Sequence, residues 1–242
     1  MNQTIEQLCA RKSVRVFTGQ PIAPKDRALI LQAASQAPTA GNQQLYTILD
    51  ITDQHLKDQL AETCDHQPFI AKAPLVLIFC ADVQKWYDAF QDAGCQPRDP
   101  GAGDLMLAVA DALIAAQNAV TAAWSLGIGS CYIGDVMEQR ERHREMLGLL
   151  EYVFPAAMLV FGYPTQQQAS RPKPDRCPME HIVHENGYHR MGRETLRTLL
   201  RDKPEQKTYE EWCQAFCDRK YNSGFSREMT RSVAEYLRQF GM

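Results

Sequence analysis

The hydrophobic pattern is strongest in residues 104–126, where the chain is apolar almost without interruption. Polar residues in this stretch recur at intervals of seven, at Asp104, Asp111, Asn118 and Ser125. That interval places them along one narrow stripe of an α-helix. We therefore predict a long helix that is buried on most of its surface. A helix of this kind needs partners on most sides, which indicates a dimer interface.

The same stretch is long enough to cross a membrane, so a transmembrane helix is an alternative interpretation. Asp111, Gln117 and Asn118 would then lie near the centre of the bilayer, where polar and ionisable side chains are costly. We therefore interpret the stretch as the central helix of a globular core and expect no membrane association.

Shorter patterns on either side predict further strands and helices. Apolar runs predict strands at residues 45–51, 75–81 and 156–162. Helices are expected at residues 2–10, 24–37 and 53–63, before Leu150, and twice after Tyr209. Pro68 and Pro74 indicate irregular structure in the segment before the strand at residues 75–81. Residues 82–103 indicate a helical piece and a mobile loop, and residues 163–188 indicate irregular structure. The predicted fold class is α+β, with few strands and many helices.

Composition excludes some classes of function. Of the 242 residues, 45% are hydrophobic and 23% are charged, which is ordinary for a globular protein with a substantial core. The net charge of −3 argues against a general nucleic-acid binder, which would carry a broad basic face. The eight cysteines are scattered, and the first residues contain no apolar signal segment. We therefore expect reduced thiols and a cytoplasmic protein.

Conventional catalytic and metal-binding patterns are absent from the sequence. Gly127 and Gly129 begin a dinucleotide-binding pattern, but Tyr132 stands where its third glycine belongs. The sequence has no Cys-x-x-Cys pair, no phosphate-binding loop of the Walker type and no Gly-x-Ser-x-Gly turn. We therefore expect no metal site. An enzyme without such groups would depend on a bound cofactor.

The stretch "RKSVRVF" concentrates positive charge near the start of an acidic chain. Arg11, Lys12, Ser13 and Arg15 lie within five residues, beside apolar valines and a phenylalanine. Such a cluster is either a solvated turn or an anion site, because arginine and serine donate charge-assisted hydrogen bonds to phosphate. A second basic group, Lys173 and Arg176, occurs late in the sequence.

Five segments in order carry a resemblance to a known family. They are "RKSVRVF", "APTAGNQQ", "HQPFIAKAPLVLIFCAD", "GIGSCYIG" and "RPKPDRCPMEHIVHEN". The chain resembles the FMN-dependent nitroreductase and flavin reductase family, in its longer branch with a C-terminal extension. The resemblance implies a mostly antiparallel or mixed sheet flanked by helices, in a homodimer with shared active sites. It also implies an FMN-binding domain over residues 1–190 and a helical extension over residues 191–242.

The resemblance implies which residues bind the phosphate and the edge of the flavin. Arg11 and Ser13 would hold the FMN phosphate, together with the basic neighbour Lys12 and the late pair Lys173 and Arg176. Arg15 would lie at the pyrimidine edge of the flavin, where a cation stabilises the negative charge of the reduced ring.

The remaining site residues come from three other segments. Pro38, Thr39 and Asn42 would reach the flavin from the partner subunit. Gln67 would place its amide at the pyrimidine edge. The turn at Tyr132, Ile133 and Gly134 would direct backbone N–H groups at the ring.

The implied function is a hydride-transferring oxidoreductase. NAD(P)H would reduce FMN and leave, and a nitroaromatic, a quinone or free flavin would take the electrons by a ping-pong mechanism. Two alternatives stay open on the sequence alone. One is a flavin-binding sensor or carrier without turnover, and the other is a specialised reaction on one metabolite.

Overall fold

The computed structural model describes residues 2–199 and 208–242, which divide into two compact units. The first unit contains the chain up to Arg171 together with Glu228–Met242, and the second contains Pro172–Arg227. The boundary at residue 190 between an FMN-binding domain and a helical extension, which the resemblance implies, stays a prediction. The return of the last residues to the first unit shows that part of the expected extension belongs to the main core.

The first unit contains the predicted long helices and the three predicted strands, together with a fourth strand at residues 129–133 that was not predicted. Its helices are α1 (Gln3–Ala10), α2 (Pro24–Ser35), α3 (Gln54–Thr63), α4 (Pro68–Ala71), α5 (Gln84–Asp92), α6 (Ala102–Ser125), α7 (Arg140–Leu147) and α8 (Gln166–Ser170). Its strands are β1 (Tyr46–Asp50), β2 (Leu75–Asp82), β3 (Gly129–Ile133) and β4 (Val153–Gly162), and its short 3-10 helices are η1 (Ala40–Asn42) and η2 (Asp135–Met137).

The regular elements of the second unit, among the residues that the structure describes, are helices separated by irregular segments. It contains η3 (Met179–His181), α9 (Arg193–Leu199) and α10 (Tyr209–Lys220). Thr208 and Glu211 form a reciprocal capping box at the start of α10. The last helix, α11 (Gly224–Gln239), begins in this unit and continues into the first.

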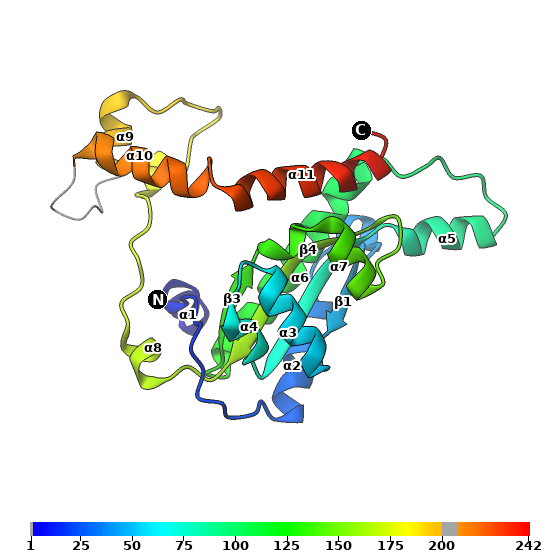
Figure 1. Cartoon of the computed structure of the whole chain (residues 1–242), viewed down its shortest axis with the longest axis horizontal. Helices are drawn as coiled ribbons and strands as arrows, with labels where there is room; N and C mark the ends of the chain where they lie inside the picture. The colour runs from blue at the N-terminus through cyan, green and yellow to red at the C-terminus, as the bar shows by residue number, and fades with distance from the viewer. Residues whose placement is uncertain (1, 200–207) are drawn as a thin grey trace. The chain divides into compact units, whose positions relative to one another are not determined.

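Four antiparallel strands form the sheet of the first unit in the order β1-β2-β4-β3. Side chains alternate along β2, so that Leu77 and Phe79 face α2, α6 and α11 while Val76 and Ile78 face α3, α4 and α7. Both faces are therefore covered by helices (Figure 1). This explains why β2 and β4 are apolar at consecutive positions rather than at alternate ones.

Helix α6 is the central helix that the hydrophobic pattern predicts. Its alanine-rich surface packs on the sheet, and its polar stripe faces α2 and the loop before β1. Asn118 donates to the carbonyl oxygen of Ala33 at 3.2 Å, and Asp111 is 2% exposed and accepts backbone hydrogen bonds. Among the described residues α6 is the one helix long and apolar enough to cross a membrane, but these contacts are those of a core helix.

Two segments that were expected to be irregular contain short helices. Pro68 occupies the first turn of α4, where its missing N–H removes no helical hydrogen bond. Thr165 caps α8, because its hydroxyl accepts from the backbone N–H of Gln168 at 3.4 Å. The expectation of irregular structure was wrong for these segments, since helices of four or five residues leave no periodic pattern to read.

Candidate functional site

The basic segment near the N-terminus is held against the edge of the sheet. The backbone N–H of Val14 donates to the carbonyl oxygen of Ser130 in β3 at 2.9 Å. A Cβ at Gly129 would lie 2.5 Å from Val14 Cγ2, and a Cβ at Gly162 would lie 2.6 Å from Phe17 Cδ1. Any larger residue at these two glycines would therefore push the segment away from β3 and β4.

This contact brings Arg11 to the segment "GIGSCYIG". Its Nη2 donates to Ser130 Oγ at 3.4 Å, and its guanidinium lies 5.8 Å from the centre of the Tyr132 ring. Burial raises the pKa of Tyr132 to about 12, although the nearby charge of Arg11 acts in the opposite direction. The structure therefore joins two predicted site segments that lie more than a hundred residues apart in the sequence.

Ser13 and Arg15 gather at the neighbouring residue, Cys131. Burial raises the pKa of the Cys131 thiol, and the charges of Arg15 and Arg11 and hydrogen bonding by Ser13 oppose that rise. Three of the predicted phosphate and flavin-edge residues thus surround one point on β3. The chemistry of Arg11 and Ser13, a guanidinium group and a hydroxyl, suits a phosphate monoester, and Arg15 adds a second cation beside them.

A cavity of about 690 Å³ opens beside Arg15. Apolar, aromatic and cationic side chains form its walls: Arg15, Val16, Phe17, Thr18, Gly19, Pro68, Phe69 and Lys72. Its size is within the range of about 300–1,000 Å³ that is typical of small-molecule sites. A flat ring with an anionic tail therefore fits the residues present. Phe69 and Lys72 were not predicted, although both belong to the quoted segment "HQPFIAKAPLVLIFCAD".

Gln67 lies beside the predicted turn at the end of β3. Its Nε2 donates to the carbonyl oxygen of Cys64 at 2.8 Å and to Asp135 Oδ2 at 3.1 Å. Tyr132 and Ile133 are the last residues of β3, and Gly134 precedes η2. The structure thus brings Gln67 next to the turn at Gly134, and Pro68, the residue after Gln67, lines the Arg15 cavity.

Lys12 is used differently from its basic neighbours. Its Nζ donates to the carbonyl oxygen of Ala169 at 2.7 Å and also to that of Arg171. These carbonyl groups lie in and just after α8, so Lys12 stabilises the end of that helix. Its predicted contact with the cofactor stays a prediction.

The loop that contains Pro38, Thr39 and Asn42 is held by α6. Asp111 accepts from the backbone N–H of Ala40 at 3.0 Å and from that of Leu45 at 3.1 Å. The Thr39 hydroxyl accepts from the backbone N–H of Gln44 at 3.2 Å. These bonds give the loop one conformation. Its contact with the flavin of a partner subunit stays a prediction, as does the role of Lys173 and Arg176, which belong to the second unit.

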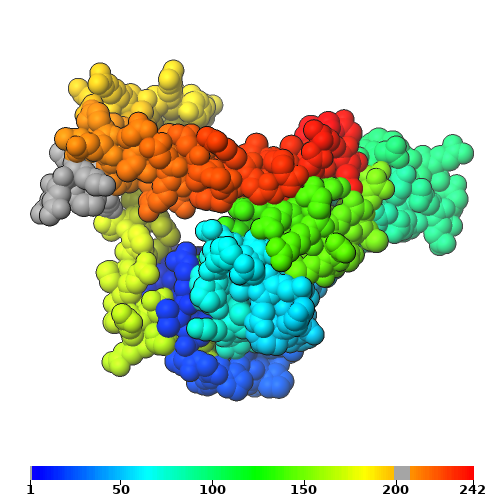
Figure 2. Space-filling model, in the orientation of Figure 1, coloured from blue at the N-terminus to red at the C-terminus, as the bar shows by residue number. Residues whose placement is uncertain are grey.

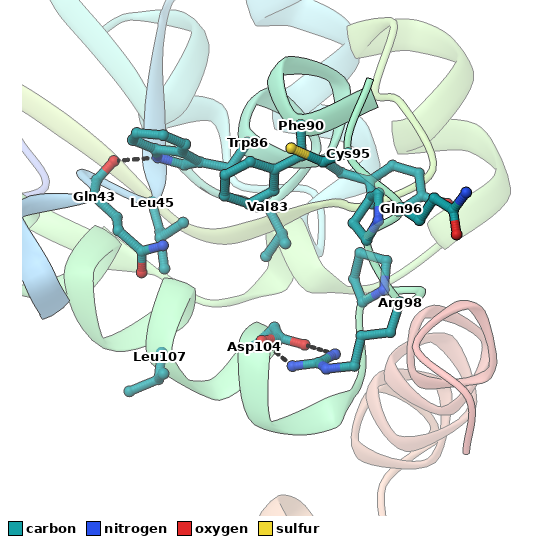
Figure 3. A pocket seen from close by; sticks show the side chains of 13 residues that line it. Gln43, Leu45, Val83, Trp86, Phe90, Cys95, Gln96, Arg98, Asp104 and Leu107 are labelled. Carbon is teal, nitrogen blue, oxygen red and sulfur yellow. Dashed lines mark hydrogen bonds and ion pairs between the residues drawn. The ribbon is translucent and has the colours of Figure 1, made fainter. Parts of the chain in front are cut away.

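A second cavity, of about 330 Å³, was not predicted. It lies between α5, the residues before α6 and the loop at Gln43, and Figure 3 shows its aromatic walls. Trp86, Tyr87 and Phe90 supply these walls from α5, which protrudes from the rest of the first unit (Figure 2). The clustered aromatic residues in "QKWYDAF" were the sequence feature that could have indicated this cavity.

A buried polar network supports the chain that follows Gly134. Ser232 of α11 is fully buried, and its hydroxyl donates to the carbonyl oxygen of Met137 at 2.6 Å and accepts from the N–H of Arg140 at 2.9 Å. His143 Nδ1 lies 2.9 Å from the carbonyl oxygen of Val136. Burial lowers the pKa of His143, so the ring is neutral and Nδ1 carries the proton.

Glu138 is a buried carboxyl group in the same region. It is 4% exposed, and its Oε1 has no hydrogen-bond partner among the residues that the structure describes. Burial, followed by the negative charges of Asp135, Asp65 and Glu228, raises the pKa of Glu138 to about 7. Ionised Glu138 therefore destabilises the folded chain.

We expect Glu138→Gln to stabilise the protein more at alkaline than at acidic pH. The raised pKa means that the folded state holds a proton that the unfolded state has lost, so stability falls as the pH rises through about 7. Removing the charge should raise the free energy of unfolding by about 1–3 kcal/mol at about pH 8, and by less at about pH 5. Urea unfolding at both pH values measures the difference.

Glu141→Gln is the matched control. Glu141 accepts hydrogen bonds from Arg231, which lowers the pKa of Glu141 to about 2, so its neutralisation should give no gain at alkaline pH. An equal gain for Glu138→Gln at both pH values would show that ionisation of Glu138 is not the cause.

Comparisons with known proteins find similarity over most of the chain. Residues 8–163 match the Nitroreductase family. The chain is 30% identical over 238 residues to an FMN reductase [NAD(P)H] of Bacillus subtilis (strain 168), covering 98% of this chain and 91% of that protein. It is 35% identical over 196 residues to an oxygen-insensitive NADPH nitroreductase of Salmonella typhimurium, covering 81% of this chain and 79% of that protein.

A solved structure extends the similarity to the whole fold. The structure of B. megaterium NfrA2 superimposes with a TM-score of 0.86 at 27% identity, covering 100% of this chain and 98% of that one. The family match includes the basic segment, Gln67 and the turn at Gly134. The expected fold is thereby confirmed, and the chain belongs to the nitroreductase family.

Proposed function

We propose that this protein is an NAD(P)H-dependent FMN oxidoreductase of the nitroreductase and flavin reductase type. The observation that carries the proposal is the gathering of Arg11, Ser13 and Arg15 against β3, beside the Arg15 cavity. The names of its relatives, an FMN reductase and an NADPH nitroreductase, support the same activity. No observation favours the alternative of a sensor or carrier without turnover.

The chain's own residues bind and orient the cofactor. Arg11 and Ser13 donate hydrogen bonds to the phosphate, and the backbone after Tyr132 approaches the ring where Gly134 has no side chain to obstruct it. Arg15 and Gln67 contact the pyrimidine edge. Lys173 and Arg176 are further candidates for phosphate binding. When bound there, FMN would supply the redox chemistry of hydride transfer between NAD(P)H and the acceptor.

We further propose that the working form is a homodimer in the cytoplasm. One side of α6 exposes large apolar side chains, with Met106 65%, Leu107 50%, Leu113 40% and Ile114 41% exposed. Their spacing by one and seven residues places them on one face, which forms a continuous apolar surface. A second copy would cover it and let the loop with Pro38, Thr39 and Asn42 reach the partner's flavin.

The activity is tested by steady-state kinetics with NADPH and a quinone. Donor and acceptor use the same site in turn, so double-reciprocal plots at several quinone concentrations should be parallel. The purified protein should also be yellow, with about one FMN per chain. A colourless protein that ignores added FMN would contradict the proposal, and so would a yellow one that does not oxidise NADPH.

We expect Arg11→Ala to weaken FMN binding by roughly tenfold to a hundredfold. A hydrogen bond to a charged group contributes about 1.5–3 kcal/mol, and about 1.4 kcal/mol corresponds to a factor of ten. Arg15→Ala should instead keep much of the affinity for oxidised FMN and lower the potential of the bound flavin, because its cation favours negative charge on the ring. Fluorescence titration with FMN and a redox titration distinguish the two roles.

The control for these variants is Lys25→Ala, which removes an exposed positive charge in α2. It should leave both measurements unchanged. If Arg11→Glu binds FMN as tightly as the unmodified protein, the segment "RKSVRVF" is a solvated turn rather than a phosphate site.

Leu113→Glu should dissociate the dimer. It sets a carboxylate into the apolar face of α6, and the unpaired charges in the interface cost several kcal/mol. Sedimentation should then report a mass near 27.4 kDa rather than twice that value. Leu150→Glu is the control, because Leu150 is 57% exposed but lies outside α6. A dimer that withstands Leu113→Glu would place the interface elsewhere.

A further inference from the structure

A third cavity, of about 320 Å³, lies where β1 ends and β2 begins. Its lining combines apolar side chains with Arg27 of α2, Lys57 of α3 and Lys72, the residue that follows α4. Among the described residues that line it, Asp50 supplies the one carboxylate. Three positive side chains against one negative side chain make this cavity cationic, in a protein whose net charge is −3.

Lys57 is buried at this cavity without a counter-ion. It is 8% exposed, and its Nζ forms no ion pair within the described part of the chain. Its Nζ donates to the carbonyl oxygen of Ala73 at 3.2 Å. Burial lowers the pKa of Lys57, the negative charge of Asp50 opposes this effect, and the positive charge of Arg27 adds to it. An ammonium group has three N–H donors, so Lys57 has further donors to offer to a bound anion.

Arg27 also has a donor to offer. Its Nη2 donates to Asp50 Oδ2, so this carboxylate is already engaged. Its Nε is buried and has no hydrogen-bond partner among the residues that the structure describes. Buried donors without acceptors are unfavourable, as are buried charges without counter-ions. An anion in the cavity would therefore stabilise both Arg27 and Lys57.

Hydrogen bonds fix the elements that carry the two lysines. Gln54 Nε2 of α3 donates to the carbonyl oxygen of Ala71 in α4 at 3.1 Å, and Lys57 makes its own bond to Ala73. Lys72 stands between these two acceptor residues, so its backbone is held against α3. A site whose elements are already in place loses less entropy when it binds a ligand.

We infer that this cavity binds a phosphate group, either as free phosphate or as part of a phosphomonoester. Such a group carries about 1.5–2 negative charges at neutral pH, which matches the excess of positive charge better than a single carboxylate does. Its oxygens accept charge-assisted hydrogen bonds from several directions, and the donors here come from α2, α3 and the end of α4. The apolar residues Pro21, Ile22 and Leu75 would contact the organic part of a phosphomonoester.

This site is distinct from the proposed cofactor site. Gly19 and Lys72 line both this cavity and the cavity beside Arg15, whereas Arg27 and Lys57 line this one. The inference goes beyond the proposed function and does not depend on it.

Calorimetry with inorganic phosphate and with glycerol 3-phosphate tests the inference. The protein is first saturated with FMN, which fills the proposed site at Arg11, and the ionic strength is held constant. Lys57→Met keeps a long apolar side chain but removes the charge, so it should weaken phosphate binding by about tenfold or more and leave the FMN content unchanged. Phosphate should also raise the melting temperature of the unmodified protein more than that of Lys57→Met.

Lys25→Met is the matched control, because Lys25 is an exposed lysine of α2 outside the cavity lining. It should bind phosphate as the unmodified protein does. Tighter binding of glycerol 3-phosphate would identify a phosphomonoester as the ligand, and tighter binding of inorganic phosphate would identify the free anion. Equal weakening in both variants, or no saturable binding of either probe to the unmodified protein, would overturn the inference.

An NMR titration of Lys57 in the unmodified protein gives a second measurement that needs no variant. A bound phosphate favours the ammonium form, so it should raise the pKa of Lys57. Lys57 resonances and a pKa that do not respond to phosphate would also overturn the inference.

Discussion

The close contact between the N-terminal basic segment and two glycines is the constraint on which the site depends. Val14 and Phe17 pack where Gly129 and Gly162 have no side chains, and this contact places Arg11 beside Tyr132. A side chain at either glycine would separate the guanidinium groups from β3. The position of the proposed anion site is therefore a consequence of backbone packing, because the edge of the sheet holds the positively charged segment in place.

Helix α6 links the core to the surfaces that the proposed function needs. Its buried side packs on all four strands, while Asp111 holds the loop before β1 through two backbone N–H groups. Another side of α6, with Met106, Leu107, Leu113 and Ile114, is apolar and exposed. A buried carboxylate is costly unless its oxygens accept hydrogen bonds, so Asp111 and the loop stabilise each other. The seven-residue spacing of the polar positions in α6 reflects this arrangement.

The sequence predicted three of the four strands and the long helices, because their hydrophobic patterns are local properties. It missed β3, which has no continuous apolar run, and also α4 and α8, which are too short to show a period. The site residues came from family resemblance, and no local pattern could show that Arg11 meets Tyr132. The cavity beside α5 was not predicted, because the sequence "QKWYDAF" resembles that of any amphipathic helix. Only the fold shows that Gln43 contacts Trp86. Long-range pairing of this kind is decided by packing, which a single sequence does not display.

Helix α11, near the end of the chain, supports the segment that follows Gly134. Ser232 joins the last residue of η2 to the first residue of α7 through one hydroxyl, and Tyr236 and Phe240 anchor its helix in the core. The hydrogen bonds of the neutral Ser232 hydroxyl thus stabilise the chain after Gly134. The buried carboxylate of Glu138 destabilises the same segment when it is ionised. A neutral hydroxyl keeps its hydrogen bonds at any physiological pH. The geometry of the turn can therefore persist while the stability of the region changes with pH.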